Sequence, residues 1–177
     1  SRLEVSRAAI SKAMGASEAS LVQRTPTPSP VSATKAGDEK PSVRQETVWW
    51  HSGGMTYDLM TMLGMTEMLC AFLEEPDLIH AIMTFLRDEM LAKMDFVEKN
   101  GLLCLNNNDL YVGSGGWGWS HELPAQDYTG PVRLKDLWGF AESQETVGAS
   151  PQHFNEFILP YQLPILEKFG LNCYACC

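Results

Sequence analysis

The chain has 177 residues, enough for one ordinary domain, and 45% of them are apolar, which suffices for a buried core. Residues 1–48 carry seven Lys or Arg against five Asp or Glu (net +2), whereas residues 49–177 carry six against seventeen (net −11), so we expect no nucleic-acid partner. The sequence has no apolar run of membrane-spanning length, no secretory signal and an odd number of cysteines, five; we therefore expect reduced thiols, no membrane partner and a cytoplasmic location.

The first 48 residues differ from the rest in composition. The segment Thr25–Ser42, TPTPSPVSATKAGDEKPS, is rich in Pro, Ser, Thr and charge, and cannot bury enough apolar surface to offset its ordering entropy. We predict that residues 1–48 form a disordered or linker-like tail, and that proteases should cut first within Thr25–Ser42. A targeting peptide is the alternative, although Glu4 and Glu18 argue against it. Residues 49–177 are then the main domain.

Two helical segments are predicted next. Met55–Leu73 has a helical pattern that Gly64 interrupts, and its methionines favour core filling over a ligand-adapting surface. Pro76–Asn100 is the clearest helix, and Gly101 should end it. Its apolar stripe at helical spacing indicates a scaffold helix: Ile79, Ile82, Met83, Leu86, Met90, Met94 and Val97.

A short buried strand is predicted at Leu102–Leu105, and polar residues follow it at once. Such residues at the carboxyl end of a strand either contact a substrate or, as turn formers, bond their own backbone. Both interpretations stay open, and Asp109 is the candidate site residue. The run Tyr111–Trp119, YVGSGGWGW, is either a mobile aromatic flap over a flat or apolar ligand, with Trp117 as a contact, or a structural loop.

The end of the chain predicts a strand, a helix and a second strand. The first strand is Trp138–Ser143 and the second is Leu171–Cys176. Ser150 is a predicted N-cap with proline after it, and Pro160 and Pro164 should kink the helix or split it in two. Two strands joined by a helix of this length pair in parallel with a right-handed crossover.

Strand alternation predicts which of these side chains meet. Side chains two residues apart share a face, so Glu142 and Gln144 lie on one face if the first strand runs that far. Small residues on the opposite face suit helix packing, so we expect these two to face inward. Tyr174 and Cys176 share one face of the second strand. A carboxylate, an amide, a phenol and a thiol should then converge at the strand ends.

Two long runs resemble the uroporphyrinogen decarboxylase superfamily. They are WGFAESQETVGASPQHFNEFILPYQLPILEKFGLNCYACC (Trp138–Cys177) and GLLCLNNNDLYVGSGGWGWSHELP (Gly101–Pro124). The most similar branch is the decarboxylase-like proteins related to corrinoid-dependent methyltransferases, and the resemblance covers roughly Met55–Cys177. It implies an α/β fold, a TIM (β/α)₈ barrel. Such a barrel typically needs about 250 residues, so we expect only part of it here, as a fragment of a longer protein.

The resemblance also implies a site. The methyltransferase members carry a His-x-Cys zinc motif on the strand that Leu171–Cys176 resembles. Tyr174 stands at the His position and Cys176 at the Cys position, so the thiol is kept and the imidazole is not. Cys176 would ligate zinc, and Glu142 would be a second ligand or a general base. The partner would be a corrinoid protein or a small-molecule methyl donor or acceptor. With one thiol retained, this chain alone should hold zinc weakly or not at all and be inactive.

Two other functions stay open. A uroporphyrinogen decarboxylase-type lyase needs no cofactor, but the arginine-rich and Asp-containing runs of that enzyme do not occur here. An acidic domain would also receive a polycarboxylate poorly. A catalytically silent fragment or binding module is the third possibility, which the tyrosine at position 174 favours.

Overall fold

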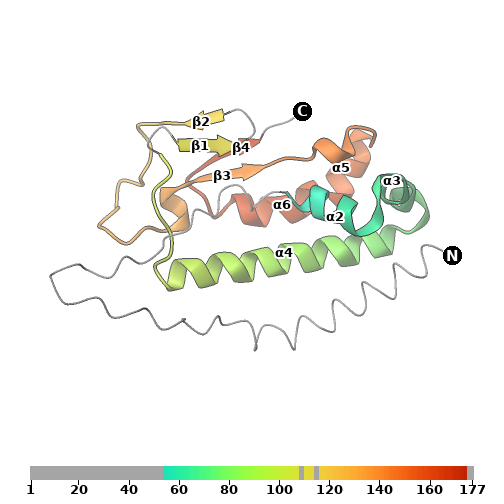
Figure 1. The fold of residues 1–177 in the computed structure, drawn as a ribbon, viewed down its shortest axis with the longest axis horizontal. Coiled ribbons are helices and arrows are strands. Elements are labelled where there is room, and N and C mark those ends of the chain that lie inside the picture. Colours follow the sequence, from blue (N-terminus) through green and yellow to red (C-terminus); the bar gives the residue numbers. More distant parts are fainter. Residues whose placement is uncertain (1–53, 108–109, 114–115, 175–177) are drawn as a thin grey trace, which may run out of the picture. The chain divides into compact units, whose positions relative to one another are not determined.

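The structure is a computed structural model that describes residues 54–107, 110–113 and 116–174, all within one unit, Gln45–Cys177. The predicted tail, residues 1–48, lies outside these ranges, as do Asp109 and Cys176. The described elements are eleven in number when the two short 3₁₀ turns η1 and η2 are counted with the helices and strands (Figure 1). They are α2 (Met55–Leu63), α3 (Met65–Glu74), α4 (Pro76–Lys99), β1 (Leu110–Gly113), β2 (Gly116–Gly118), η1 (Leu134–Asp136), β3 (Trp138–Ala141), η2 (Gln144–Thr146), α5 (Pro151–Phe157), α6 (Leu159–Leu166) and β4 (Leu171–Tyr174).

The predicted helices are confirmed, with their ends at the expected glycines. Gly64 separates α2 from α3 with a φ of 91°, in the left-handed region that favours glycine. Gly101 follows α4 with a φ of 64°. Its N–H donates to the Glu98 carbonyl at 3.0 Å, and the N–H of Leu102 donates to the Val97 carbonyl at 2.9 Å. These two bonds are those of a Schellman motif, which satisfies the last helical carbonyls.

The predicted strand–helix–strand unit is present, and β3 and β4 pair in parallel. The intervening helix is split at Ile158, two residues before Pro160, into α5 and α6. Ser150 caps α5, because its side chain accepts a hydrogen bond from the N–H of His153 at 3.2 Å. β3 is shorter than predicted: it ends at Ala141, so Glu142 lies just beyond the strand.

Two segments differ from the sequence-based expectation. Leu102–Leu105 forms no strand, only an isolated bridge at Leu103. There the side chain of Asn106 makes hydrogen bonds to the main chain of Trp138 that a strand backbone would otherwise make. It donates to the Trp138 carbonyl at 3.0 Å and accepts from the Trp138 N–H at 2.9 Å. The glycine-rich run expected to be a flap or loop forms the antiparallel hairpin β1–β2.

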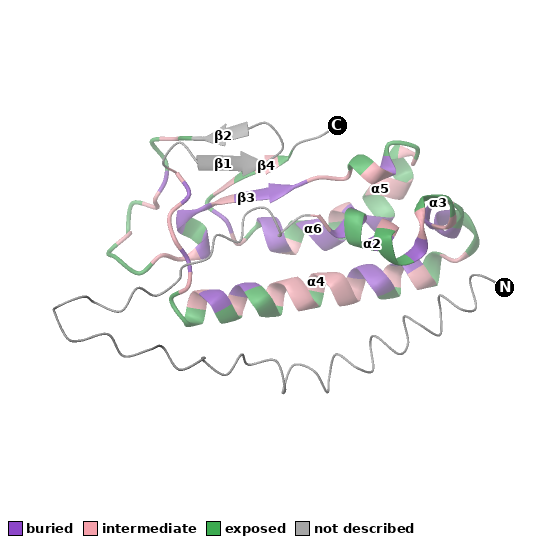
Figure 2. Ribbon diagram, in the orientation of Figure 1, coloured by how far each residue is buried: buried purple, intermediate pink, exposed green. Residues whose placement is uncertain are grey.

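The core lies where α6 packs between the β3–β4 sheet and α4 (Figures 1 and 2). α4 and α6 contribute fully buried apolar side chains to it, and β3 is buried along most of its length (Figure 2). The described chain is thus mainly helical with a small two-stranded parallel sheet. In the described ranges we find no helix long and apolar enough to cross a membrane. Prominent core residues are Leu59, Met68, Ile79, Ile82, Met83, Met94, Phe157, Ile158 and Ile165.

Candidate functional site

The carboxyl ends of β3 and β4 point toward α2 and α5, and polar residues gather there (Figure 1). The main-chain carbonyl of Glu142 accepts a hydrogen bond from Nε2 of Gln162 at 2.8 Å and a longer one from the Thr56 hydroxyl at 3.4 Å. Thr56 stands in the first turn of α2, and Gln162 stands in α6. Both side chains are fully buried. The end of β3 is therefore fixed from two sides.

Gln162 also fixes Tyr174, the last described residue of β4. The Tyr174 hydroxyl donates to Oε1 of Gln162 at 2.9 Å and lies 3.0 Å from the Ser143 hydroxyl. Gln162 thus uses both ends of its amide, one on each strand. A buried amide is stable only when its polar atoms have partners, so this network orients the strand ends.

Tyr174 lies on the same face of the sheet as the small residues of β3, and its convergence with the Glu142 side chain stays a prediction. In the register of the sheet, Ala141 lies opposite Tyr174 and Gly139 lies opposite Asn172. Asn172 donates to the Leu166 carbonyl at 3.1 Å and Tyr174 reaches Gln162, so both side chains extend toward α6. The small residues of β3 face the helix, as predicted. The alternation of side chains along β4 places the phenol of Tyr174 on that same face. A shift of one residue along the strand would place it on the opposite face.

Three carboxylates lie near the end of β3: Asp58, Glu142 and Glu145. Burial raises the pKa of Glu142 above its ordinary value, and the charge of Glu145 raises it further. The same two causes, in the same order, raise the pKa of Asp58. Glu145 accepts a hydrogen bond from the Thr56 hydroxyl at 2.8 Å, which holds its carboxylate at the start of α2. A carboxyl group with a raised pKa is suited to exchange protons nearer neutral pH.

The other candidates are dispersed. Gln144 lies in η2 and is exposed, and only the backbone of Trp117 is described, in β2. Asn107, close to Asp109 in the chain, has a structural role. Its side chain bonds the main chain of Ser120 and Leu123 and the Trp138 indole. The described asparagines of the polar run thus bond distant segments and not their own backbone, as turn formers would.

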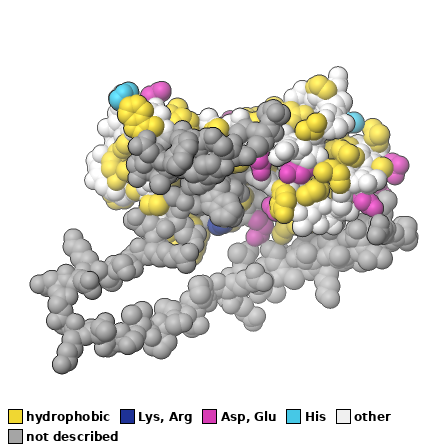
Figure 3. Space-filling model, turned by 45° about the horizontal axis from the view of Figure 1, so that its top comes forward, with side chains coloured by type: hydrophobic (Ala, Val, Ile, Leu, Met, Phe, Trp, Pro, Cys, Tyr) yellow, Lys and Arg dark blue, Asp and Glu magenta, His cyan; other side chains and the backbone are white. Residues whose placement is uncertain are grey.

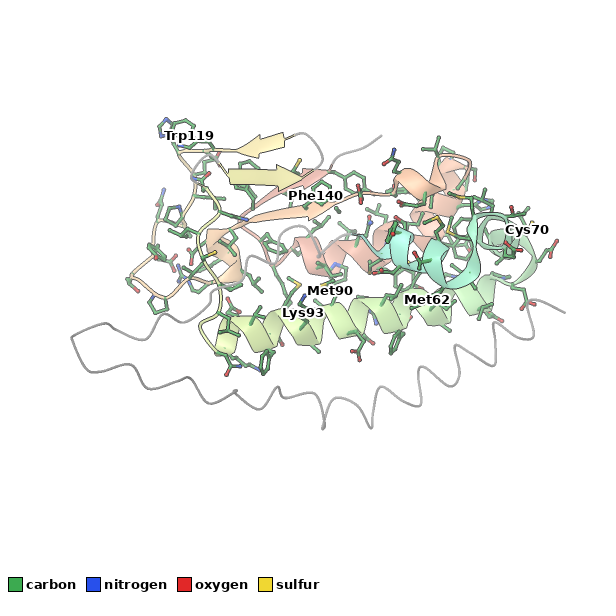
Figure 4. All side chains as sticks on the ribbon, viewed as in Figure 1. Met62, Cys70, Met90, Lys93, Trp119 and Phe140 are labelled. Atoms are coloured by element: carbon green, nitrogen blue, oxygen red, sulfur yellow. The ribbon has the colours of Figure 1, made fainter. Side chains whose placement is uncertain are left out.

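Trp119, which follows β2, is an exposed aromatic residue at the end of the glycine-rich region. Its side chain is 57% exposed and contacts the His121 ring edge-on at 4.4 Å between centroids. It projects outward, away from the helix that carries Met90 and Lys93 (Figure 4). Trp119 therefore does not cover the ends of β3 and β4.

A zinc ion is not accommodated by the described residues. We find among them no group of three His, Cys, Asp or Glu side chains that could hold a metal ion. Cys70, Cys104 and Cys173 are free thiols. The Tyr174 hydroxyl, at the position where the resemblance places a histidine ligand, is hydrogen-bonded to Gln162 and Ser143. Cys176 as a ligand remains a prediction.

Sequence reasoning missed Asp58, Glu145 and Gln162. Glu145 lies three residues from Glu142, and their proximity was visible in the sequence. Asp58 and Gln162 belong to helices, and only the packing of α2 and α6 against the strand ends brings them to the site.

No family model, curated protein or solved structure matches this chain.

Proposed function

We propose that the chain forms part of a uroporphyrinogen decarboxylase-like TIM barrel whose site transfers a methyl group to a thiol. The parallel β3–α5–α6–β4 unit is the kind of unit that such a barrel repeats, and its polar residues lie at the carboxyl ends of the strands. The single observation that carries the proposal is the position of Glu142, held just after β3 through its main-chain carbonyl by Thr56 and Gln162, where burial raises the pKa of its carboxyl group. The corrinoid expected on the partner protein would supply the methyl group.

In this proposal Glu142 is the general base. A thiol that becomes methylated gives up its proton, and a carboxylate whose pKa is raised toward neutrality accepts a proton more readily than an ordinary glutamate. Thr56 and Gln162 fix the main chain of Glu142, which restricts where its side chain can reach. Because the described residues do not fit a zinc ion, no step is assigned to zinc.

A catalytically silent binding module is the second candidate. It is favoured by the Tyr174 hydroxyl, whose hydrogen bonds to Gln162 and Ser143 give it a structural role. The decarboxylase alternative has weaker support, because Asp58, Glu142 and Glu145 would repel a polycarboxylate substrate.

The test measures methylcobalamin binding and the transfer of its methyl group to 2-mercaptoethanol, in the presence and absence of the chain. We expect bound methylcobalamin, and any protein-dependent transfer should fall at least about ten-fold in Glu142→Gln. Glu167→Gln removes a charge from an exposed glutamate just after α6 and should leave both measurements unchanged. The sequence predicts that this chain alone is inactive, so binding without transfer supports a partial site. If the chain neither binds methylcobalamin nor promotes the transfer, the result contradicts the proposal and favours the silent module.

A further inference from the structure

A hollow of about 280 Å³ lies beside the candidate site, between the end of β3 and the start of α5. Its walls come from Ser143, from η2 and the turn after it, and from Pro151 and Phe154 of α5. An apolar cavity of roughly 150 Å³ can hold benzene, whereas pockets for drug-sized ligands begin near 300 Å³. The hollow is therefore of a size for a molecule with a single ring.

The residues that line the hollow disfavour a charged ligand. None of the described residues that line the hollow is acidic, basic or histidine. Placing an ion against such a surface costs solvation energy without an opposite charge to offset it. Val147, Pro151 and Phe154 give the hollow apolar walls, and Val147 is 77% exposed. A ligand that covers Val147 removes apolar surface from water, which favours binding.

One wall offers a polar group in a fixed position. The Ser143 hydroxyl lies 3.0 Å from the Tyr174 hydroxyl, which Gln162 holds in turn. Because the Tyr174 hydroxyl gives its one proton to Gln162, the Ser143 hydroxyl donates to the Tyr174 oxygen. The Ser143 oxygen keeps acceptor capacity for a ligand that donates a hydrogen bond. Phe154 meets the Tyr174 ring edge-on with centroids 6.2 Å apart, which supports the aromatic wall from behind.

We propose that this hollow is a binding site for a small, uncharged molecule with one apolar ring and one hydroxyl group. The ring lies between Val147 and Phe154, and the polar group bonds Ser143. This assignment uses only the lining of the hollow and does not depend on the methyl-transfer proposal.

The test is a titration of the full chain with benzyl alcohol, followed through the NMR signals of the Val147 and Ala149 methyl groups. We expect saturable shifts with a dissociation constant in the millimolar range, as befits a ligand of this size. Benzoate and benzylamine, which have the same ring but carry a charge, should bind at least about ten-fold more weakly. Tighter binding of benzylamine would assign the shifts to the nearby carboxylates and overturn the proposal.

Two variants complete the design. Val147→Glu puts a charge at the mouth of the hollow and should weaken benzyl alcohol binding about ten-fold. Leu73→Glu makes a comparable change at a side chain that is 74% exposed, in α3, and should leave the dissociation constant unchanged. Both positions are exposed, so both variants should fold. Shifts that do not saturate, equal binding of benzoate, or an unchanged dissociation constant in Val147→Glu would each refute the site. Because methyl transfer is not measured, these outcomes leave the proposed function to its own test.

Discussion

At the scale of single residues, Glu142 combines two separate roles. Its main-chain carbonyl is a structural acceptor for Thr56 and Gln162, and its side chain is a carboxyl group with a raised pKa. A substitution that changes only the side chain therefore separates the electrostatic role from the structural one. Glutamine is the suitable replacement, because it keeps the size of the side chain and removes the charge.

We predict that Glu142→Gln changes the pH dependence of stability. A carboxyl group whose pKa is raised on folding binds its proton more tightly in the folded chain, so stability falls as pH rises from the unfolded pKa, about 4.3, to the folded one. The advantage of the variant over the wild type in free energy of unfolding should thus grow between pH 4 and pH 8. We expect less than about 1 kcal/mol, since water still reaches the carboxyl group.

Urea titrations across this pH range measure the effect. Glu167→Gln, at an exposed position, is the control for the loss of one negative charge. If the curves for the wild type and Glu142→Gln run parallel from pH 4 to pH 8, the carboxyl group of Glu142 is not perturbed by the fold.

At the scale of elements, the close approach of the sheet to α6 and its following turn depends on a glycine. A Cβ at Gly139 would lie 2.5 Å from Oδ1 of Asn172 and 2.5 Å from the ring of Phe169. Real Cβ atoms do not approach other heavy atoms this closely. Phe169 is buried, so its ring has little room to move, whereas the exposed Asn172 side chain is tied to the Leu166 carbonyl. Gly139 is therefore needed where β3, β4 and the end of α6 meet.

We predict that Gly139→Ala lowers the free energy of unfolding by about 1–3 kcal/mol, the usual cost of overpacking a core. Gly148→Ala is the matched control, because the nearest atom to its Cβ would be Cδ1 of Leu69 at 3.7 Å, an ordinary contact. Urea unfolding of the two variants gives the comparison. An equal, small change in both would show that the contact between β3 and the end of α6 relaxes without cost.

At the scale of the whole molecule, the described elements share one core. α4 contacts α2, α3, α5 and α6, and α6 contacts both α4 and β3. The surface that encloses this core is acidic, since residues 49–177 carry a net charge of −11. Acidic and hydrophobic side chains are interspersed on the face in Figure 3. A core shared by all the helices and β3 should unfold as a unit.

We predict that Ile165→Ala destabilises the described region as a whole by about 2–5 kcal/mol, because Ile165 is fully buried in α6. Leu163→Ala, on the same helix but 42% exposed, should change stability much less. Far-ultraviolet circular dichroism follows the helices, and tryptophan fluorescence includes Trp138 at the start of β3. We expect both signals to change together in one transition. Separate transitions for helix and sheet would contradict a shared core.

The sequence by itself determined the local structure of this chain. Gly64, Gly101, Ser150 and Pro160 act through their own backbone and side-chain chemistry, so the ends of the helices followed from them without tertiary contacts. The parallel pairing of β3 and β4 followed from the length of the connecting helix, whereas Glu142, predicted within the first strand, lies just beyond its end at Ala141. Leu102–Leu105 was predicted wrongly because the Asn106 side chain, not the backbone, pairs with Trp138.

Only the tertiary structure decided what surrounds the strand ends. The face on which Tyr174 lies depends on the register between β3 and β4, and a shift of one residue reverses it. Gln162 and Asp58 reach the site because α6 and α2 pack there. The raised pKa of Glu142 likewise arises from burial and from the charge of Glu145. Burial, strand register and the distance between charges arise only when the elements pack together, so they cannot be predicted from the local preferences of the sequence.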